Sequence, residues 1–149
     1  MIKASYYKQE FWFSCLPACI RMLLEFYNIK IEEKELRKLF KTTTEGGTNW
    51  LDVVSGMKEF DINFVYLKNQ NSDKLKELIS QNTPVIVSVD TRKLGDFAHR
   101  QHTVVVIDIN ENYVTIHDPE KGPNMRLKIT KFIDAWKNRL NRIGYIVRK

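Results

Sequence analysis

Cys15 is the residue of this chain whose position most favours chemistry. Apolar residues recur at helical spacing over residues 15–27, and Ser14 is suited to cap the start of this predicted helix. At a helix start, unpaired backbone amides and the positive end of the helix dipole stabilise a thiolate, the nucleophilic form of cysteine. Cys19 lies one turn further along, where this effect has faded. The alternative is that Cys15 is a small buried apolar side chain, the commoner role of a helical cysteine.

A histidine and a carboxylate that could serve such a thiol are predicted to lie on one β-hairpin. Residues 110–112 (Asn-Glu-Asn) are typical of a tight turn between two strands. If this loop has three residues, Ile109 faces Tyr113, and His102 and Asp118 become diagonal neighbours on one face of the sheet. A carboxylate in that place fixes the imidazole tautomer and stabilises its charged form. A two-residue loop would separate the pair, so the prediction depends on register.

Gln9 could supply the remaining group that thiol chemistry on a carbonyl needs. The developing oxyanion requires hydrogen-bond donors, and the Gln9 side-chain amide and the Cys15 backbone N–H are the candidates. Taken alone, Gln9 is an ordinary surface glutamine. Of the other histidines, His117 should point to the opposite face of the hairpin, and His99 lies in the loop before it. His102 is therefore the preferred base, although a lone histidine at a strand end is more often structural.

The elements that must position these side chains are helices first and strands later. The predicted helices are 15–27, 31–40, a third that carries Leu51, Val54, Met57 and Phe60, 72–80 and 130–136; the predicted strands are 62–66, 84–89, 102–109, 113–117, 126–129 and 143–147. This order indicates an α+β domain with a mostly antiparallel sheet. No linker, repeat or low-complexity tract divides the sequence, so we expect a single domain over residues 1–149.

The composition is that of a globular protein with one ordinary core. The chain has 149 residues, of which 43% are hydrophobic and 28% are charged. No segment approaches the ~20 consecutive apolar residues that span a bilayer, and the N-terminus lacks a signal-peptide pattern. We therefore expect a cytoplasmic protein without membrane insertion.

The two cysteines are predicted to be free thiols. Two are too few for a disulfide framework, and side chains four residues apart on a helix rarely meet with disulfide geometry. Cys-x-x-x-Cys without a second ligand pair is also a poor zinc signature. We expect no metal and no cofactor.

The net charge of +6 is concentrated near the C-terminus. Residues 126–149 hold eight basic residues and one acidic residue, which accounts for all of the excess. A solvated basic surface is the commonest explanation, and a docking face for an acidic substrate or partner is the alternative. Nucleic acid is not expected as a partner, because the cluster lacks interleaved aromatic residues and any binding motif.

The order of these motifs resembles a known family. Gln9, five further residues and then Cys15 in Ser-Cys-Leu-Pro-Ala-Cys-Ile-Arg-Met-Leu-Leu resemble the N-terminal motif of the papain-like bacteriocin-processing peptidases. These are double-glycine leader peptidases that are often fused to export transporters. Further landmarks follow in family order and cover most of the chain: residues 47–49 before an amphipathic helix, 102–107, 117–119 with Gly122, and 132–136.

The resemblance implies a papain-like fold, with N-terminal helices packed on the sheet, and a cysteine peptidase activity. Cys15 matches the nucleophile, His102 the base, Asp118 the orienting carboxylate and Gln9 the oxyanion donor. Leu16 is a departure, because many members have glycine after the cysteine.

The resemblance also implies a substrate-binding segment and a preference at the cleaved bond. The segment is Gly47, Thr48, Asn49 and Trp50, and the preference is for small residues such as glycine. Asn28 stands near the place where a glycine commonly ends the first helix, and asparagine tolerates that left-handed cap.

Three functions remain open on the sequence. The first is peptide hydrolysis, and the second is a transpeptidase in which an amine replaces water at the same triad. The third is a silent module that binds a peptide or leader, although such modules typically lose the cysteine or the histidine. We expect a peptide or protein substrate, and a stand-alone domain, without a transporter, that could associate with a separate exporter.

Overall fold

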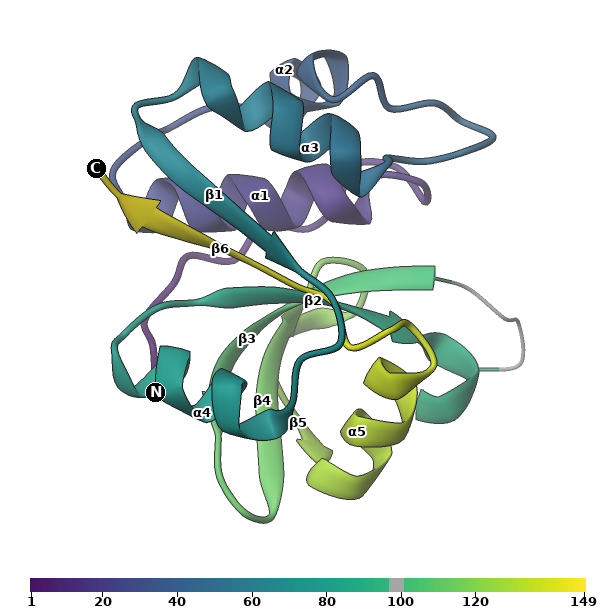
Figure 1. Cartoon of the computed structure of the whole chain (residues 1–149). Coiled ribbons are helices and arrows are strands. Elements are labelled where there is room, and N and C mark those ends of the chain that lie inside the picture. The colour runs from purple at the N-terminus through teal and green to yellow at the C-terminus, as the bar shows by residue number, and fades with distance from the viewer. Residues whose placement is uncertain (97–100) are drawn as a thin grey trace.

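A single antiparallel sheet organises the protein. The computed structural model describes residues 1–96 and 101–149, and within them six strands are ordered β1-β6-β2-β3-β4-β5 (Figure 1). The strands are β1 (Ile62–Leu67), β2 (Val85–Asp90), β3 (Gln101–Ile109), β4 (Tyr113–Asp118), β5 (Gly122–Lys128) and β6 (Ile143–Arg148). The helices are α1 (Cys15–Phe26), α2 (Glu33–Leu39), α3 (Trp50–Gly56), α4 (Ser72–Ser80) and α5 (Ile129–Lys137), with 3₁₀ turns η1 (Met57–Glu59) and η2 (Thr91–Leu94).

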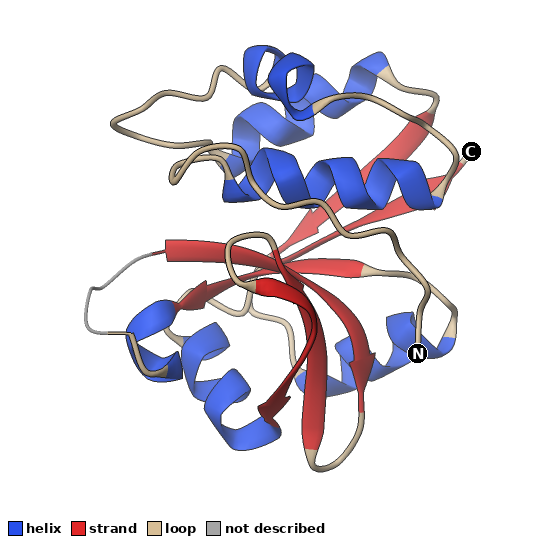
Figure 2. Ribbon diagram, turned by 180° about the vertical axis from the view of Figure 1, so that it is seen from behind, coloured by secondary structure: helices blue, strands red, loops and turns tan. Residues whose placement is uncertain are grey.

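Helices cover both faces of the sheet. Figures 1 and 2 show α1, α2 and α3 on one side and α4 and α5 on the other. Ile86 and Val105 belong to the core under the first group, whereas Val87 and Val104 belong to the core under the second. The two central strands are thus buried on both faces, which explains why their sequences are continuously apolar rather than alternating. The predicted α+β class with an antiparallel sheet is confirmed.

Helix α1 is the rigid support for Cys15. Its apolar face is fully buried, and each large side chain there contributes about 1.5–3 kcal/mol by leaving water. Asn28 follows the C-cap residue of the helix; it has a φ of 65° and donates its backbone N–H to the Glu25 carbonyl over 2.9 Å. Asparagine therefore does fill the left-handed position where glycine is usual.

Helix α3 buries a different face from the predicted one. Leu51, expected on the buried stripe, is 64% exposed, and Trp50, Val53 and Gly56 are buried instead. A Cβ on Gly56 would lie 2.7 Å from the Phe40 ring, so this close approach selects which face packs. The helix ends at Gly56, and the predicted continuation becomes the 3₁₀ turn η1.

The fifth strand was also predicted with the wrong bounds. β5 begins at Gly122, four residues before the predicted start, and Ile129 already belongs to α5. β5 pairs only with β4 among the described strands, and most of its side chains are exposed or half-buried. Such an edge strand lacks the apolar alternation by which strands are recognised in a sequence.

The β3–β4 hairpin differs from the prediction at its loop and agrees with it at its open end. Ile109 pairs with Val114 rather than with Tyr113, and Asn110 donates its N–H to the Tyr113 carbonyl, which closes a two-residue loop of Glu111 and Asn112. A β-bulge at Ile107 then absorbs one residue, so that Val105 pairs with His117. This is the register that the predicted His102–Asp118 pair required.

Within the described residues, none of the helices combines the length and the apolar character needed to cross a membrane.

Candidate active site

His102 and Asp118 meet at the open end of the hairpin. His102 is the second residue of β3 and Asp118 is the last residue of β4, and both side chains are buried. The imidazole Nε2 lies 2.7 Å from Asp118 Oδ1, so the Nε2 proton is donated to the carboxylate. This bond leaves Nδ1 as the ring atom that can exchange a proton with another group.

The Asp118 carboxylate is held by its own turn. Its Oδ1 also accepts the backbone N–H groups of Glu120 over 2.9 Å and Lys121 over 3.2 Å. Burial raises the pKa of Asp118, but the hydrogen bond and charge of His102, together with these two amides, outweigh it and lower the pKa overall. The carboxylate therefore stays ionised and fixes the orientation of the ring.

Cys15 lies beside this pair at the start of α1. Burial of its sulfur raises the pKa of the thiol, but hydrogen bonding and charge from His102, with a smaller contribution from Thr103, lower it below its usual value. Burial likewise lowers the pKa of His102, while the hydrogen bonds and charges of Asp118 and Cys15 raise it to about 10. These shifts favour a thiolate on Cys15, an imidazolium on His102 and a carboxylate on Asp118.

Cys19 has the opposite character. It is fully buried, and its Sγ donates to the Thr103 carbonyl over 3.4 Å. Burial, followed by the charges of Cys15 and Asp118, raises the pKa of Cys19 well above its usual value, so this thiol stays protonated. Both cysteines are free. In residues 1–96 and 101–149, no group of three or more His, Cys, Asp or Glu side chains could hold a metal ion.

Gln9 is not a surface glutamine. It is only 8% exposed, and its Nε2 donates to the Phe11 carbonyl over 2.8 Å, which commits one of the two N–H groups of the amide. Its backbone N–H donates to the Pro119 carbonyl over 2.7 Å, so the segment before α1 is tied to the turn that carries Asp118. Cys15 is the first residue of α1, and its backbone N–H therefore has no acceptor within the helix.

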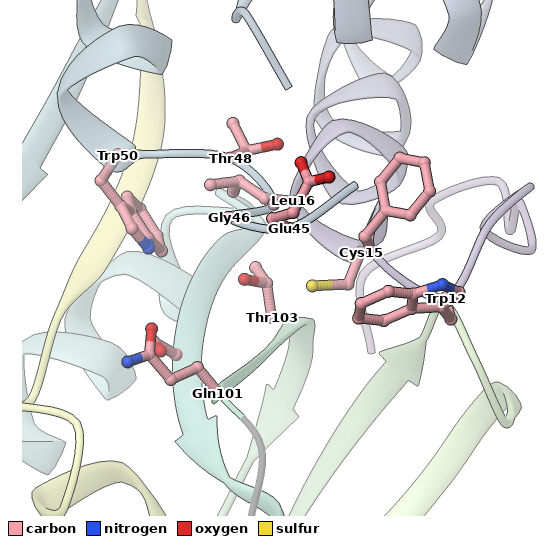
Figure 3. A pocket seen from close by; sticks show the side chains of 12 residues that line it. Trp12, Cys15, Leu16, Glu45, Gly46, Thr48, Trp50, Gln101 and Thr103 are labelled. Atoms are coloured by element: carbon pink, nitrogen blue, oxygen red, sulfur yellow. The ribbon is translucent and has the colours of Figure 1, made fainter. Parts of the chain in front are cut away.

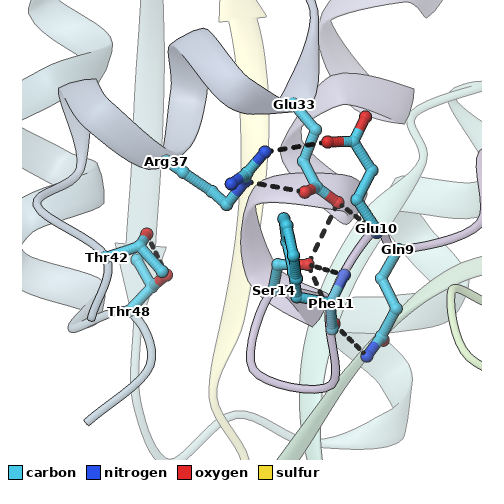
Figure 4. Close-up of polar contacts among 8 residues, drawn as sticks. All are labelled: Gln9, Glu10, Phe11, Ser14, Glu33, Arg37, Thr42 and Thr48. Atoms are coloured by element: carbon cyan, nitrogen blue, oxygen red, sulfur yellow. Dashed lines mark hydrogen bonds and ion pairs between the residues drawn. The ribbon is translucent and has the colours of Figure 1, made fainter. Parts of the chain in front are cut away.

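The loop that leads from Gln9 to Cys15 rests on a buried acid that sequence analysis did not find. Glu33 of α2 is 1% exposed, and its Oε1 accepts the Glu10 backbone N–H over 2.9 Å and lies 3.2 Å from Ser14 Oγ (Figure 4). Arg37 Nε lies 2.9 Å from Glu33 Oε2, but without hydrogen-bond alignment. The signal available in the sequence was the spacing of four between Glu33 and Arg37, which also occurs in ordinary surface ion pairs.

Ser14 occupies the predicted N-cap position without acting as a side-chain cap. Its hydroxyl accepts the Phe11 N–H over 3.0 Å and lies 2.9 Å from the Phe11 carbonyl, while no N–H of α1 bonds to it. The hydroxyl closes the loop before the helix instead. As a result, the first amides of α1, including that of Cys15, are not shielded by the Ser14 side chain.

A cleft of about 330 Å³ opens next to Cys15. Figure 3 shows Cys15 and Trp12 on one side of it, and Trp50 and Gln101 across from them. Its lining residues are Trp12, Phe13, Cys15, Leu16, Glu45, Gly46, Gly47, Thr48, Trp50, Ser88, Gln101 and Thr103. The exposed Trp12 was not anticipated, because a single aromatic residue in a loop carries no pattern in the sequence.

Three of the four residues predicted to bind substrate lie in this cleft. Gly47, Thr48 and Trp50 line it, and Gly47 has a φ of 64°, which glycine adopts without strain. Asn49 does not line it, because its side chain accepts the Leu51 N–H over 2.9 Å and caps α3. Asn49 instead borders a second pocket on the far side of Trp50.

His117 has a structural position on the other face of β4, as predicted. Its Nε2 bonds to the Ala4 carbonyl over 2.8 Å and must carry the proton, while Nδ1 accepts the Asn124 N–H over 3.1 Å. The ring therefore fastens the N-terminal segment to the sheet. His99 lies outside the described residues.

The sequence profile of the peptidase C39 family matches residues 3–140, so this chain belongs to that family. The fold is also that of solved C39 domains. A double-glycine-motif protease from an AMS/PCAT transporter, solved with its leader peptide, superposes with a TM-score of 0.79 at 18% identity, covering 99% of this chain and 94% of that one. No curated protein sequence matches this chain significantly.

Two further structures show the same fold. A C39-like peptidase from Bacillus anthracis has a TM-score of 0.81 at 15% identity and covers 100% of this chain and 96% of its own. The peptidase domain of Streptococcus ComA, a bifunctional ABC transporter of a quorum-sensing pathway, has a TM-score of 0.79 at 22% identity, with 100% of both chains covered. Family membership supports the predicted class, a cysteine peptidase.

Proposed function

We propose that this protein hydrolyses peptide bonds with Cys15 as nucleophile, His102 as acid and base, and Asp118 as the group that orients the histidine. The observation that carries the proposal is the 2.7 Å bond between His102 and Asp118 beside a thiol whose pKa is lowered. Gln9 Nε2 and the Cys15 backbone N–H are the proposed oxyanion donors.

The reaction follows from the protonation states of these groups. The Cys15 thiolate attacks the peptide carbonyl carbon, and the oxygen takes on negative charge next to the two donors. The C–N bond then breaks as the His102 imidazolium gives its proton to the leaving amine, which leaves a thioester on Cys15. Neutral His102 next takes a proton from water, and the resulting hydroxide cleaves the thioester. The products are a free acid, the Cys15 thiolate and the imidazolium.

The proposed substrate is a leader-type peptide with small residues, such as glycine, at the cleaved bond. The support is twofold: a structural relative is described as a double-glycine-motif protease with a bound leader peptide, and large side chains, Trp12, Leu16 and Trp50, border the cleft. Walls of this size leave little room for a bulky residue next to Cys15. We further propose that the protein acts in the cytoplasm, where a separate exporter could receive the cleaved peptide.

The direct test is product analysis with peptides that contain a single Gly-Gly site. We expect two fragments in mass spectrometry, and incorporation of one oxygen from ¹⁸O-labelled water into the new carboxyl group. A product joined to an added amine, with no labelled acid, would instead identify a transpeptidase. Binding of the peptides without any product after long incubation would identify a silent binding module and would contradict the proposal.

Gln9→Ala should lower kcat about 10²-fold to 10³-fold, the usual effect of losing one oxyanion donor. KM should change little, because the donor acts on charge that develops only after attack. Gln81→Ala, which removes an exposed glutamine at the end of α4, is the matched control and should behave like the unaltered protein. If KM instead rose by about 10²-fold to 10³-fold while kcat stayed unchanged, Gln9 would bind substrate rather than stabilise the oxyanion.

A further inference from the structure

A second, basic pocket adjoins the cleft that holds Cys15. It has a volume of about 400 Å³ and shares Gly46, Thr48, Trp50 and Gln101 with the cleft. Figure 3 shows Trp50 and Gln101 across the cleft from Trp12, and these two residues also line the second pocket. Its other lining residues are Asn49, Leu51, Tyr66, Lys68, Arg139 and Arg142. An extended peptide in the cleft could therefore continue past Trp50 into this basic pocket.

The charge of this pocket is unbalanced. Three of its lining residues, Lys68, Arg139 and Arg142, are basic, and none of its lining residues is acidic. The Nε atoms of Arg139 and Arg142 are buried and have no hydrogen-bond partner among the described residues. Burial, followed by the charge of Arg142, lowers the pKa of Arg139, although the charge of Asp90 partly opposes this. Both arginines are half-buried as residues, so the unpaired groups are these two Nε–H donors, and an anion in the pocket could accept from them.

The nearby carboxylate of Asp90 does not occupy the pocket. It accepts the Arg92 backbone N–H over 3.1 Å and the Asn138 side-chain amide over 3.0 Å, and it lies 3.7 Å from the Arg92 guanidinium. Asp90 is 1% exposed and is not among the lining residues. Its bond to Asn138 helps to hold the turn that carries the two arginines.

The turn of residues 138–142 is held by hydrogen bonds, which keeps the pocket formed before a ligand binds. Residues 138–142 follow α5, and the Trp136 indole N–H donates to the Arg142 carbonyl over 2.9 Å. The Asn141 side chain donates to the Gln70 carbonyl over 2.6 Å, and Asn141 adopts a left-handed φ of 46°. The backbone of this turn is thus held from two directions before any ligand arrives, and little backbone entropy remains to be lost on binding.

We propose that this pocket binds the side-chain carboxylate of a glutamate or aspartate in the peptide substrate, a few residues from the cleaved bond. Arg139 and Arg142 are then specificity-determining residues, since paired guanidinium donors match a carboxylate better than a neutral amide. The inference rests on the proposed peptidase function. It assigns a role to two of the basic residues near the C-terminus and leaves the others as solvated surface.

The test compares peptides that differ only in one carboxylate. A positional series of acetylated and amidated Gly-Gly peptides carries Glu or Gln at each of the second to sixth places on either side of the bond. With blocked ends, the varied residue is the one place where the two peptides differ in charge. We expect the unaltered protein to prefer Glu by about tenfold in kcat/KM at one position, the worth of a charge-assisted hydrogen bond.

Arg142→Gln should reduce that Glu/Gln ratio to below about threefold, and Arg139→Gln should reduce it as well. The ratio is measured within each variant, so partial misfolding does not distort it. Lys131→Gln removes one positive charge from the exposed side of α5 and should preserve both the ratio and the rate. A ratio near one at every position, or a ratio that survives both arginine substitutions, overturns the inference even if the peptides are cleaved.

A binding measurement separates this inference from the peptidase proposal. Fluorescence anisotropy with the Cys15→Ala variant reports the affinity for the same labelled Glu and Gln peptides without cleavage. We expect tighter binding of the Glu peptide, and the difference should shrink at 1 M salt, where the Debye length is about 3 Å. If no peptide is cleaved but this Arg142-dependent difference persists, the pocket assignment stands and the hydrolase proposal fails.

Discussion

Cys15→Ala should abolish peptide hydrolysis, with a loss of about 10⁵-fold or more in kcat. Without the sulfur no thioester can form, and the only remaining route is direct attack by water on the unactivated amide. Peptide binding should persist, because the cleft walls are untouched by removal of one sulfur atom. The measurement is single-turnover cleavage of a Gly-Gly peptide, followed by mass spectrometry for a covalent acyl-enzyme in the unaltered protein.

Cys19→Ala is the matched control, because it removes the same atom one turn along the same helix. Cys19 is fully buried and protonated, so we expect a lower melting temperature and a nearly unchanged kcat per folded molecule. Hydrolysis by Cys15→Ala at a rate close to that of the unaltered protein would refute Cys15 as nucleophile. If Cys19→Ala lost cleavage while Cys15→Ala kept it, Cys19 rather than Cys15 would be the nucleophile.

The sequence predicted the His102–Asp118 pair correctly, but from a hairpin loop of the wrong length. The hairpin loop has two residues rather than three, which by itself would shift the register by one and turn the pair to opposite faces. The bulge at Ile107 restores the register before the strand reaches His102. Such a bulge in a strand buried on both faces leaves no trace in the apolar pattern, so no periodicity argument could have located it.

Features created by packing between distant segments escaped prediction. Glu33 becomes part of the active-site support only because α2 lies against the loop that precedes α1, and a glutamate at a helix start is otherwise ordinary. Arg139 and Arg142 form a pocket only where their turn meets Trp50 and Gln101. The sequence could show that positive charge gathers near the C-terminus, but not which of those charges would line a pocket beside the cleft.

His102→Gln should lower kcat about 10⁴-fold or more, because it removes both the acid for the leaving amine and the base for water. It should also change the thiol itself. Burial, which raises the pKa of Cys15, and the smaller lowering by Thr103 would remain, while the imidazolium that lowers this pKa would be lost. The pKa of Cys15 should therefore rise above that of a free cysteine, about 8.5. Iodoacetamide labelling as a function of pH, with the site identified by peptide mapping, measures this shift.

In the unaltered protein, the same experiment should show labelling of Cys15 at a lower pH than a free cysteine requires, since its pKa is lowered. Hydrolysis should decline on the acid side as the thiolate takes up a proton. It should decline again on the alkaline side near pH 10, as the His102 imidazolium loses its proton. Cys19 is the internal reference and should stay unlabelled throughout. A labelling midpoint for Cys15 that is the same with and without His102 would mean that the imidazole does not activate the thiol.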